Sequence, residues 1–236
     1  MRNFFITVLL IGSGYCSMAL AVPVALNGQY SIDGKASVLA ADGTRFEDSF
    51  SDDNLSTPLP LLGTVSVGSD AGSTASALAV ADSGSLLAIT DTVAGSEFAD
   101  AGARAIFLGD FTAPGQPLRL RFDIFNDAQV GGVDAFTQAV LSFALAGAGQ
   151  VLLNETLTFG VADLGQQIVT RDFFLPAGTP GLLDIALFSR SGGFDGAAAG
   201  NIFSVAFGLN TVPEPATWFL LIPGLAGMAL IGRRRG

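Results

Sequence analysis

The sequence contains no histidine, and Cys16 is its one cysteine. Zinc, copper and haem centres are usually held by histidine or cysteine, and Ser-His-Asp and Cys-His sites use histidine as their base. These absences exclude the common metal centres and the histidine-dependent hydrolases. Lys35 is the one lysine, so a Ser-Lys dyad would need that residue, which we interpret instead as a solvated strand residue.

Aromatic residues with a polar edge are almost as scarce, because the chain has one tryptophan, Trp218, and two tyrosines, Tyr15 and Tyr30. Sugar sites commonly stack a ring on an exposed Trp or Tyr. Trp218 and Tyr15 stand near the two ends, so a lectin-like site in the body of the chain would depend on Tyr30. The phenylalanines fit alternating core positions instead, for example Phe122, Phe143, Phe159 and Phe203.

Basic residues are also few, since 11 Lys plus Arg stand against 21 Asp plus Glu. Setting aside Arg2, Glu214 and the arginines at 233–235 leaves seven basic and twenty acidic residues between positions 22 and 211, a net charge of −13. Nucleic acids and anionic lipids are bound through Lys and Arg, which neutralise phosphates. The charge therefore excludes a role on DNA or RNA.

Three kinds of segment follow one another at the C-terminus. Pro213 and Pro215 hold Glu214 in an extended segment, because proline fixes its own φ and disfavours the helical region for the residue before it. Residues 216–232 contain no ionisable side chain, and as a helix these 17 residues would reach about 25 Å, close to the roughly 30 Å hydrocarbon core of a bilayer. The alternative is an amphipathic or buried helix that ends in a basic C-terminus, but this run shows no polar stripe. The arginines at 233–235 then favour a cytoplasmic end, with the body of the chain outside.

Residues 212–236 closely resemble the sorting signal of the PEP-CTERM family of exported bacterial proteins. That signal joins a Val-Pro-Glu-Pro motif, a short membrane helix and a terminal arginine run in this order. The resemblance implies that an exosortase, a membrane cysteine transpeptidase, recognises the motif, cleaves near it and releases the protein to the cell surface or an exopolysaccharide matrix. The residues implied are the sorting motif, Pro213, Glu214 and Pro215, and the cytoplasmic stop, Arg233, Arg234 and Arg235.

The N-terminus predicts export as well. Arg2 supplies a positive n-region, residues 4–11 form an apolar h-region, and Ala19 and Ala21 make an A-x-A cleavage site. Residues 1–21 are therefore predicted to be a signal peptide that signal peptidase removes after Ala21.

Removal of the signal peptide also removes Cys16. A lipoprotein anchored on this cysteine is less consistent with the sequence, because Tyr15 stands where a lipobox has a small residue. The body, residues 22–211, then has no cysteine to form a disulfide and must be stabilised by its core. Its 190 residues suffice for one ordinary domain.

The body shows a hydrophobic period of two. In residues 118–124 leucine, phenylalanine and isoleucine alternate with arginine and aspartate, which indicates a strand with one buried face. Similar β-rich runs occupy residues 30–39, 63–67, 85–90, 105–111, 139–145, 150–159, 167–175, 182–189 and 201–209. Clusters of Gly, Asn, Asp and Pro separate them, including 191–196. About ten short strands predict an antiparallel β-sandwich that is jelly-roll-like.

Two stretches are less regular. Residues 74–81 are small and fit either a strand or a short helix, and we favour a strand because no cap or wide apolar stripe accompanies them. Residues 42–60 predict a long polar edge hairpin or loop. Oxygen ligands of the kind that calcium takes are present there, but their spacing differs from an EF-hand loop, so we interpret them as a solvated acidic face. These residues are Asp42, Glu47, Asp48, Asp52 and Asp53.

Residues 82–85 read Asp-Ser-Gly-Ser after an apolar run, which is similar to the turn of aspartic proteases. Their chemistry needs two carboxylates that share a proton, and the sequence has no second copy. We interpret the segment as a Ser-Gly turn between strands.

The sequence therefore predicts an exported, non-enzymatic β-sandwich without cofactor or metal, with a structural or adhesive role at the cell surface or in the extracellular matrix. Its predicted partners are an exosortase-like transpeptidase, signal peptidase, the membrane before processing and, as a candidate, exopolysaccharide. The alternative is a carbohydrate-binding or calcium-dependent binding module. A secreted hydrolase is a more distant alternative.

Overall fold

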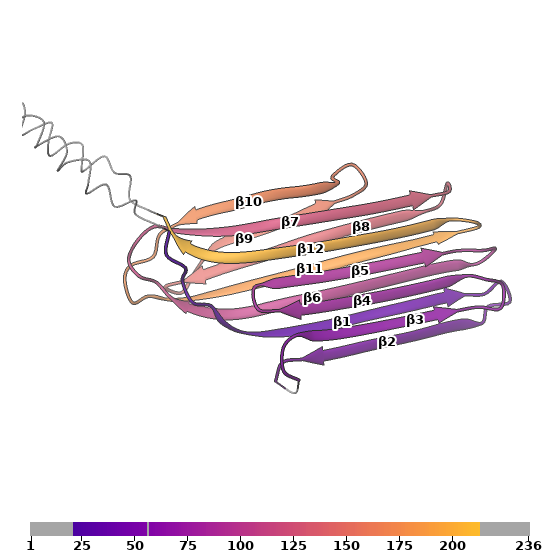
Figure 1. Cartoon of the computed structure of the whole chain (residues 1–236), viewed down its shortest axis with the longest axis horizontal. Helices are drawn as coiled ribbons and strands as arrows, with labels where there is room; N and C mark the ends of the chain where they lie inside the picture. Colours follow the sequence, from indigo (N-terminus) through magenta and orange to yellow (C-terminus); the bar gives the residue numbers. More distant parts are fainter. Residues whose placement is uncertain (1–20, 56, 213–236) are drawn as a thin grey trace, which may run out of the picture.

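The computed structural model describes residues 21–55 and 57–212. Every regular element in this part of the chain is a β-strand (Figure 1), as the hydrophobic period of two predicts. The strands are β1 Asn27–Leu39, β2 Arg45–Asp53, β3 Leu61–Gly68, β4 Thr74–Asp82, β5 Ser85–Val93, β6 Phe98–Thr112, β7 Leu118–Gly131, β8 Phe136–Gly147, β9 Gln150–Phe159, β10 Gly165–Phe173, β11 Pro180–Phe194 and β12 Ala198–Thr211. None of the described residues forms a helix long and apolar enough to cross a membrane.

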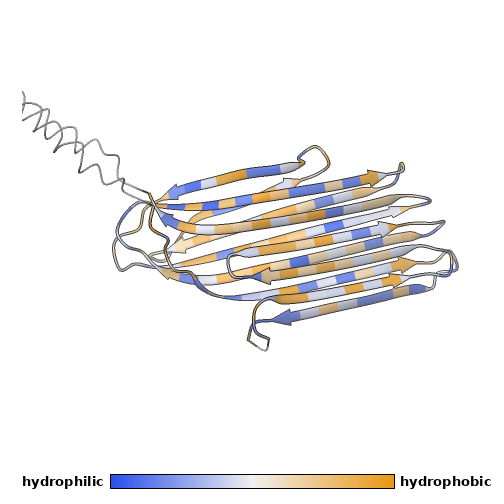
Figure 2. Ribbon diagram, viewed as in Figure 1, coloured by the Kyte–Doolittle hydropathy of each residue, from blue (hydrophilic) through white to orange (hydrophobic). Residues whose placement is uncertain are grey.

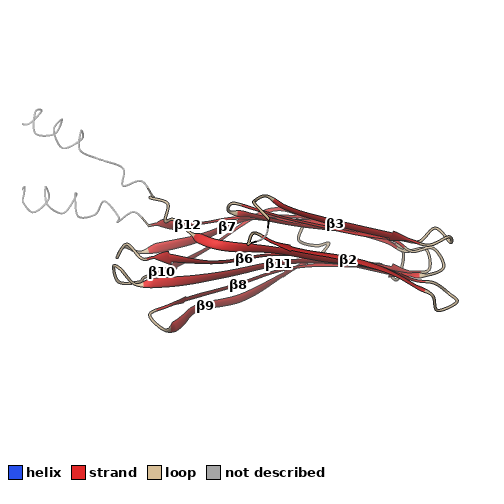
Figure 3. Cartoon of the chain, turned by 90° about the horizontal axis from the view of Figure 1, so that it is seen from below, coloured by secondary structure: helices blue, strands red, loops and turns tan. Residues whose placement is uncertain are grey.

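The strands form two six-stranded antiparallel sheets, which Figure 3 shows edge on as two layers. The first sheet has the order β2-β1-β6-β11-β8-β9, and the second has the order β10-β7-β12-β5-β4-β3. Between β5 and β12 the chain passes from one sheet to the other at every connection except the β8–β9 turn. The predicted antiparallel β-sandwich is confirmed.

The core lies between the two sheets and is built by alternation along each strand. In β7, Leu118, Leu120, Phe122 and Ile124 are buried, while the arginines and aspartates between them face solvent. Figure 2 shows the same alternation as changes between hydrophobic and hydrophilic colours along the strands. Facing sheets meet through aromatic pairs such as Phe122 and Phe143, whose ring centroids lie 4.6 Å apart, a favourable separation for tilted rings.

The structure contains two strands beyond the regular runs of the sequence. Residues 74–82 form β4, so the strand favoured for that stretch is confirmed. Residues 45–53 form β2, which pairs with β1 at the edge of the first sheet. Polar side chains occupy both faces of this edge strand, so its sequence shows no period of two, although Phe50 on one face is partly buried against the core.

The turn expected over residues 191–196 is shorter than predicted. β11 continues to Phe194, and β12 begins at Ala198. Gly192 and Gly193 belong to the strand because their backbones pair with Asp100 and Ala99 of β6.

The two open edges of the sandwich are closed in different ways. At the β2–β3 edge the Phe50 ring fills the space left by two glycines, Gly34 and Gly63, one from each sheet. A Cβ added at Gly63 would lie 2.1 Å from this ring, so the close approach requires glycine. At the β9–β10 edge, Arg171 of the second sheet makes a bidentate ion pair with Glu155 of the first, at 2.6 Å and 2.5 Å.

The pair of Glu155 and Arg171 predicts a pH-dependent stability. Hydrogen bonding from Arg171 lowers the pKa of Glu155 from its ordinary value of 4.5. A lowered folded-state pKa stabilises the native state above the unfolded value and loses that effect as the pH falls through the folded value. We therefore expect Glu155→Gln to lower the free energy of unfolding at pH 7 by at most about 1 kcal/mol, because both side chains are partly exposed.

Urea unfolding of parent and variant at pH 7 and pH 3 measures this difference, which is expected to shrink at pH 3. Asp123→Asn is the matched control, since Asp123 pairs with Arg121 on the same strand and links no sheets. The same difference between parent and Glu155→Gln at both pH values would contradict the assignment.

Candidate functional site

The two ends of the body meet at one end of the sandwich. The Val22 amide donates to Thr211 Oγ1, and the Thr211 amide donates to the Val22 carbonyl, both at 2.9 Å. Pro23 forms an isolated antiparallel bridge with Asn210. Figure 1 shows that the first described residues and the end of β12 lie together. The predicted signal cleavage after Ala21 and the predicted sorting tail therefore adjoin the same place on the fold.

The sorting motif begins directly where the sandwich ends. Thr211 is buried and pairs with Leu118 of β7, and the Val212 amide donates to the Pro117 carbonyl at 2.7 Å. Ala21 is exposed at the same end. The other predicted site residues lie outside the described part of the chain: Ala19, Pro213, Glu214, Pro215, Arg233, Arg234 and Arg235.

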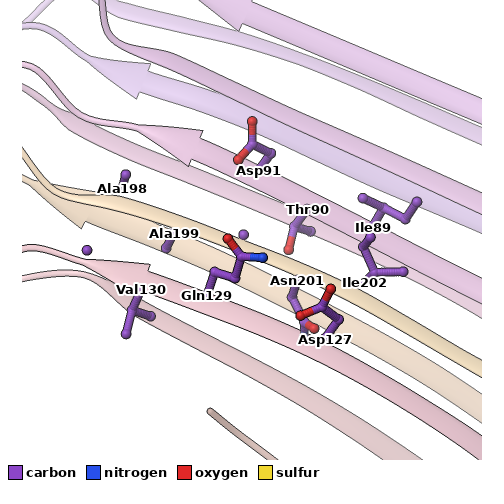
Figure 4. Close-up of a pocket in the computed structure, with 12 residues that line it drawn as sticks. Ile89, Thr90, Asp91, Asp127, Gln129, Val130, Ala198, Ala199, Asn201 and Ile202 are labelled. Carbon is purple, nitrogen blue, oxygen red and sulfur yellow. The ribbon is translucent and has the colours of Figure 1, made fainter. Parts of the chain in front are cut away.

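A shallow trough runs over the outer face of the second sheet, above β5, β12 and β7. Its floor is formed by outward-facing residues of the middle strand β12, where the small Gly200, Ser204 and Ala206 are interrupted by Ile202, which is 40% exposed. Two hollows of about 480 Å³ and 960 Å³ open along it. The first is shown in Figure 4. We call this surface the outer trough.

Polar and apolar side chains alternate around the outer trough. Asp91 of β5 and Gln129 of β7 both pair with Gly200, and Asp127 lies one outward position further along β7. These groups can accept and donate hydrogen bonds. The second hollow contains Phe125, a ring 36% exposed on the same face. The arrangement offers hydrogen-bonding groups and one aromatic surface, as a sugar ligand would need.

Sequence reasoning missed Phe125 because the phenylalanines were assigned to the core. The signal was nevertheless present, since the period of two that buries Phe122 and Ile124 places residue 125 on the opposite face. The other four phenylalanines expected in the core are buried: Phe122, Phe143, Phe159 and Phe203.

Tyr30 does not form the exposed ring that a lectin-like site required. It is 7% exposed and packs against Phe107, with ring centroids 4.9 Å apart. Its hydroxyl accepts a hydrogen bond from the Gly84 amide at 3.0 Å, and burial raises the pKa of Tyr30. Pairing of β1 with β6 places this residue between the sheets, so its ring is not available as the exposed surface on which the lectin-like alternative depended.

The acidic residues of β2 lie on both faces of the strand instead of pointing toward one another. Glu47 faces Lys35 and Arg45, at 2.6 Å and 2.7 Å, and hydrogen bonding from Lys35 lowers its pKa. Asp48 and Asp52 occupy the alternate positions of β2 and point to the other face. Across residues 21–55 and 57–212 no three carboxylates are grouped closely enough to hold a metal ion.

The Asp-Ser-Gly-Ser segment is a hairpin turn. Asp82 ends β4, Ser85 begins β5, and the two residues pair directly. The Asp82 carboxylate accepts from the Ser83 amide at 2.7 Å, and Gly84 has a φ of +74°. The glycine therefore serves the turn, as we interpreted from the sequence.

Comparison with known proteins identifies the tail. Residues 211–235 match the model of the PEP-CTERM protein-sorting motif, which confirms the resemblance of the C-terminal segment. The motif indicates an exported protein that is sorted by exosortase-type machinery through a membrane-anchor type of tail. No curated protein matches the chain.

Two solved structures of infectious bursal disease virus share 12% identity with the chain. One is the structure of the Gx strain; the alignment covers 84% of this chain and 82% of the viral chain, with a TM-score of 0.19. The other is the VP2 subviral particle; the alignment covers 85% of this chain and 69% of the viral chain, with a TM-score of 0.18. Scores this low carry no argument about the fold or function of the chain.

Proposed function

We propose that the chain is the precursor of a non-enzymatic surface or extracellular-matrix protein, and that exosortase-type processing at Pro213, Glu214 and Pro215 releases its β-sandwich. The match of residues 211–235 to the sorting motif carries the proposal. The order β5-β12-β7-β10 facing β6-β11-β8-β9 supports a jelly roll as the exported domain. Its role in this proposal is structural or adhesive.

Two structural observations support release near the motif. Among the described residues, the last backbone hydrogen bond that holds β12 and its extension is donated by Val212, so a cut after Val212 leaves the described strand pairing in place. The N-terminal cut after Ala21 likewise leaves Val22 and Pro23 paired to β12. Both processing steps are thus compatible with an intact sandwich.

Intact-mass analysis of the protein recovered from medium, envelope and matrix fractions of the native host tests the proposal. The expected product begins at Val22 and lacks the arginines at 233–235, and it is found outside the inner membrane. Recovery of the chain from the cytosol with both ends intact would refute the proposal.

A second candidate function is carbohydrate binding in the outer trough, which Phe125, Asp127 and Gln129 favour by their placement on one open face. We expect the full chain to bind soluble exopolysaccharide fragments. Phe125→Ala is expected to weaken this binding about tenfold, the loss of roughly 1.4 kcal/mol of contact energy.

The matched control is Phe136→Ala, because Phe136 has a similar exposure of 37% but lies on the first sheet. Titration by calorimetry, with and without calcium, measures both variants. Equal affinities of the two variants, or no binding by the parent, would exclude the trough as the sugar site.

A further inference from the structure

The two ends of the sandwich differ in charge. The tail-side end comprises the lead segment 21–26 and the connections 54–60, 83–84, 113–117, 148–149 and 174–179. None of these segments contains an ionisable side chain. At the opposite end, which we call the far end, each of the six connections contains one acidic residue and no basic one. The acidic residues are Asp42, Asp70, Glu97, Asp134, Asp163 and Asp195.

The preference of aspartate for turns explains why the far end is acidic, but not why the tail-side end is neutral. Aspartate suits turns because its carboxylate accepts from nearby amides, and Asp42 accepts from the Thr44 amide at 2.8 Å. The tail-side connections need turns too, but they use proline and glycine, as in residues 113–117 and 174–179. Their neutrality in a body of net charge −13 therefore needs another reason.

The outermost part of the tail-side end is uncharged and partly apolar. Connections 54–60 and 83–84 are set back from it, since Asn54 bonds to Tyr30 and Gly84 to Phe207. The tail-side tip is thus formed by residues 21–26 and the connections 113–117, 148–149 and 174–179. Val22 and Phe174 in this tip are each 58% exposed. The first charges behind the tip are Asp110 of β6 and the pair of Arg119 and Asp172, which form an ion pair at 2.6 Å.

We propose that the tail-side tip is the surface that faces the phospholipid headgroups while the tail is still uncut. This inference rests on the proposed function, in which the tail is a membrane anchor. Four residue steps separate Val212 from Ala216, where the predicted span begins, and an extended chain covers about 14 Å in that length. The tether is thus too short to hold the sandwich clear of the headgroups.

The charges on the sandwich then determine its orientation relative to the membrane. Lying on its side would press one sheet against the headgroups, and both outer faces carry carboxylates, such as Asp184 on the first sheet and Asp127 on the second. Standing on its tip brings only neutral connections to the surface. β6 has 15 residues, so the far end stands about 46 Å away, several times the Debye length of about 10 Å at 0.1 M salt.

Removal of the signal peptide strengthens this arrangement. Cleavage after Ala21 converts the Val22 amide into an α-ammonium, which adds a positive charge at the tip beside Thr211. A cation there is attracted to phosphate headgroups, while the six acidic connections at the far end remain directed away from the membrane.

The experiment uses the full chain, produced without an exosortase and carrying Cys16→Ala so that a single new cysteine takes a fluorophore. Gln116→Cys labels the tip, and Val133→Cys labels a far-end residue that is 99% exposed. Vesicles of phosphatidylethanolamine and phosphatidylglycerol contain a lipid with a nitroxide on its headgroup. We expect quenching at position 116 to exceed quenching at position 133 several-fold.

Charge variants test the physical reason. Ala148→Asp with Phe174→Asp adds two carboxylates at the tip, and we expect it to lower quenching at position 116 on anionic vesicles but not on phosphatidylcholine vesicles. Ala41→Asp with Val161→Asp adds the same charge at the far end and is expected to leave quenching unchanged. Equal loss in both variants would contradict the role of the neutral tip.

Flotation of the vesicles separates the possible failures. A chain that floats with the vesicles but is quenched equally at both positions overturns the orientation and leaves the anchor intact. A chain that does not float shows that the tail is no anchor, and the proposed function and the orientation are then both overturned.

Discussion

Replacing Phe122 with alanine is expected to lower the free energy of unfolding by about 3–5 kcal/mol, the usual cost of removing a buried phenylalanine. Phe122 is 0% exposed and lies in β7, where its ring contacts Phe143 of the facing sheet. The truncation leaves a cavity between the sheets that neighbouring strands, fixed by their hydrogen-bond ladders, fill only in part. Urea unfolding followed by circular dichroism measures the change.

Phe125→Ala provides a control of the same chemistry on the same strand. Its ring faces solvent on the outer trough, so we expect a loss below about 1 kcal/mol. Equal losses of unfolding free energy in the Phe122→Ala and Phe125→Ala variants would mean that β7 does not lie in the register that buries Leu120 and Phe122. The comparison therefore tests the sandwich itself, independently of any function.

Glu214→Ala is expected to abolish processing of the tail, so that the chain accumulates in the inner membrane at its unprocessed mass. Glu214 is the charged centre of the sorting motif, and the match over residues 211–235 makes it part of the segment that the processing enzyme reads. Deleting residues 233–235 is expected to have a similar effect, because a terminal arginine cluster is predicted to hold the end of the tail at the cytoplasmic side.

The sandwich should remain folded in both variants, because the pairing of β12 ends at Thr211. Asp134→Ala is the control. Asp134 is exposed in a far-end connection, so the substitution removes one carboxylate without changing the tail. Membrane fractionation with intact-mass analysis reports all three chains. Normal export of the Glu214→Ala variant would show that the motif is not the processing signal.

The strands that the sequence predicted best are those whose two faces differ. Residues 118–124 alternate strictly, and β7 buries the apolar members as expected. β2 could not be recognised in the same way, because its polar residues are wet on both faces. Its position depends on pairing with β1 and on the fit of Phe50 against Gly34 and Gly63, contacts between residues far apart in the sequence.

The candidate binding surfaces were predicted less well than the fold. The sequence left open a lectin-like site that would depend on Tyr30, but the β1–β6 register buries this residue beside Phe107. The outer trough was not predicted, because it needs small residues of β12 to lie between larger ones of β5 and β7. Which strands become neighbours is a non-local property of the chain.

The sequence by itself determined that the body of the chain, residues 22–211, is all-β and that the tail resembles a sorting signal. Both features depend on residues that are neighbours in the sequence: a period of two in the body, and a motif followed by an apolar run and arginines in the tail. Only the tertiary structure decided that Val22 and Thr211 meet, that the neutral connections gather at their end, and that one carboxylate occupies every connection at the other. The physical reason is that antiparallel pairing reverses the chain at each strand, so alternate connections share an end whatever their distance in sequence.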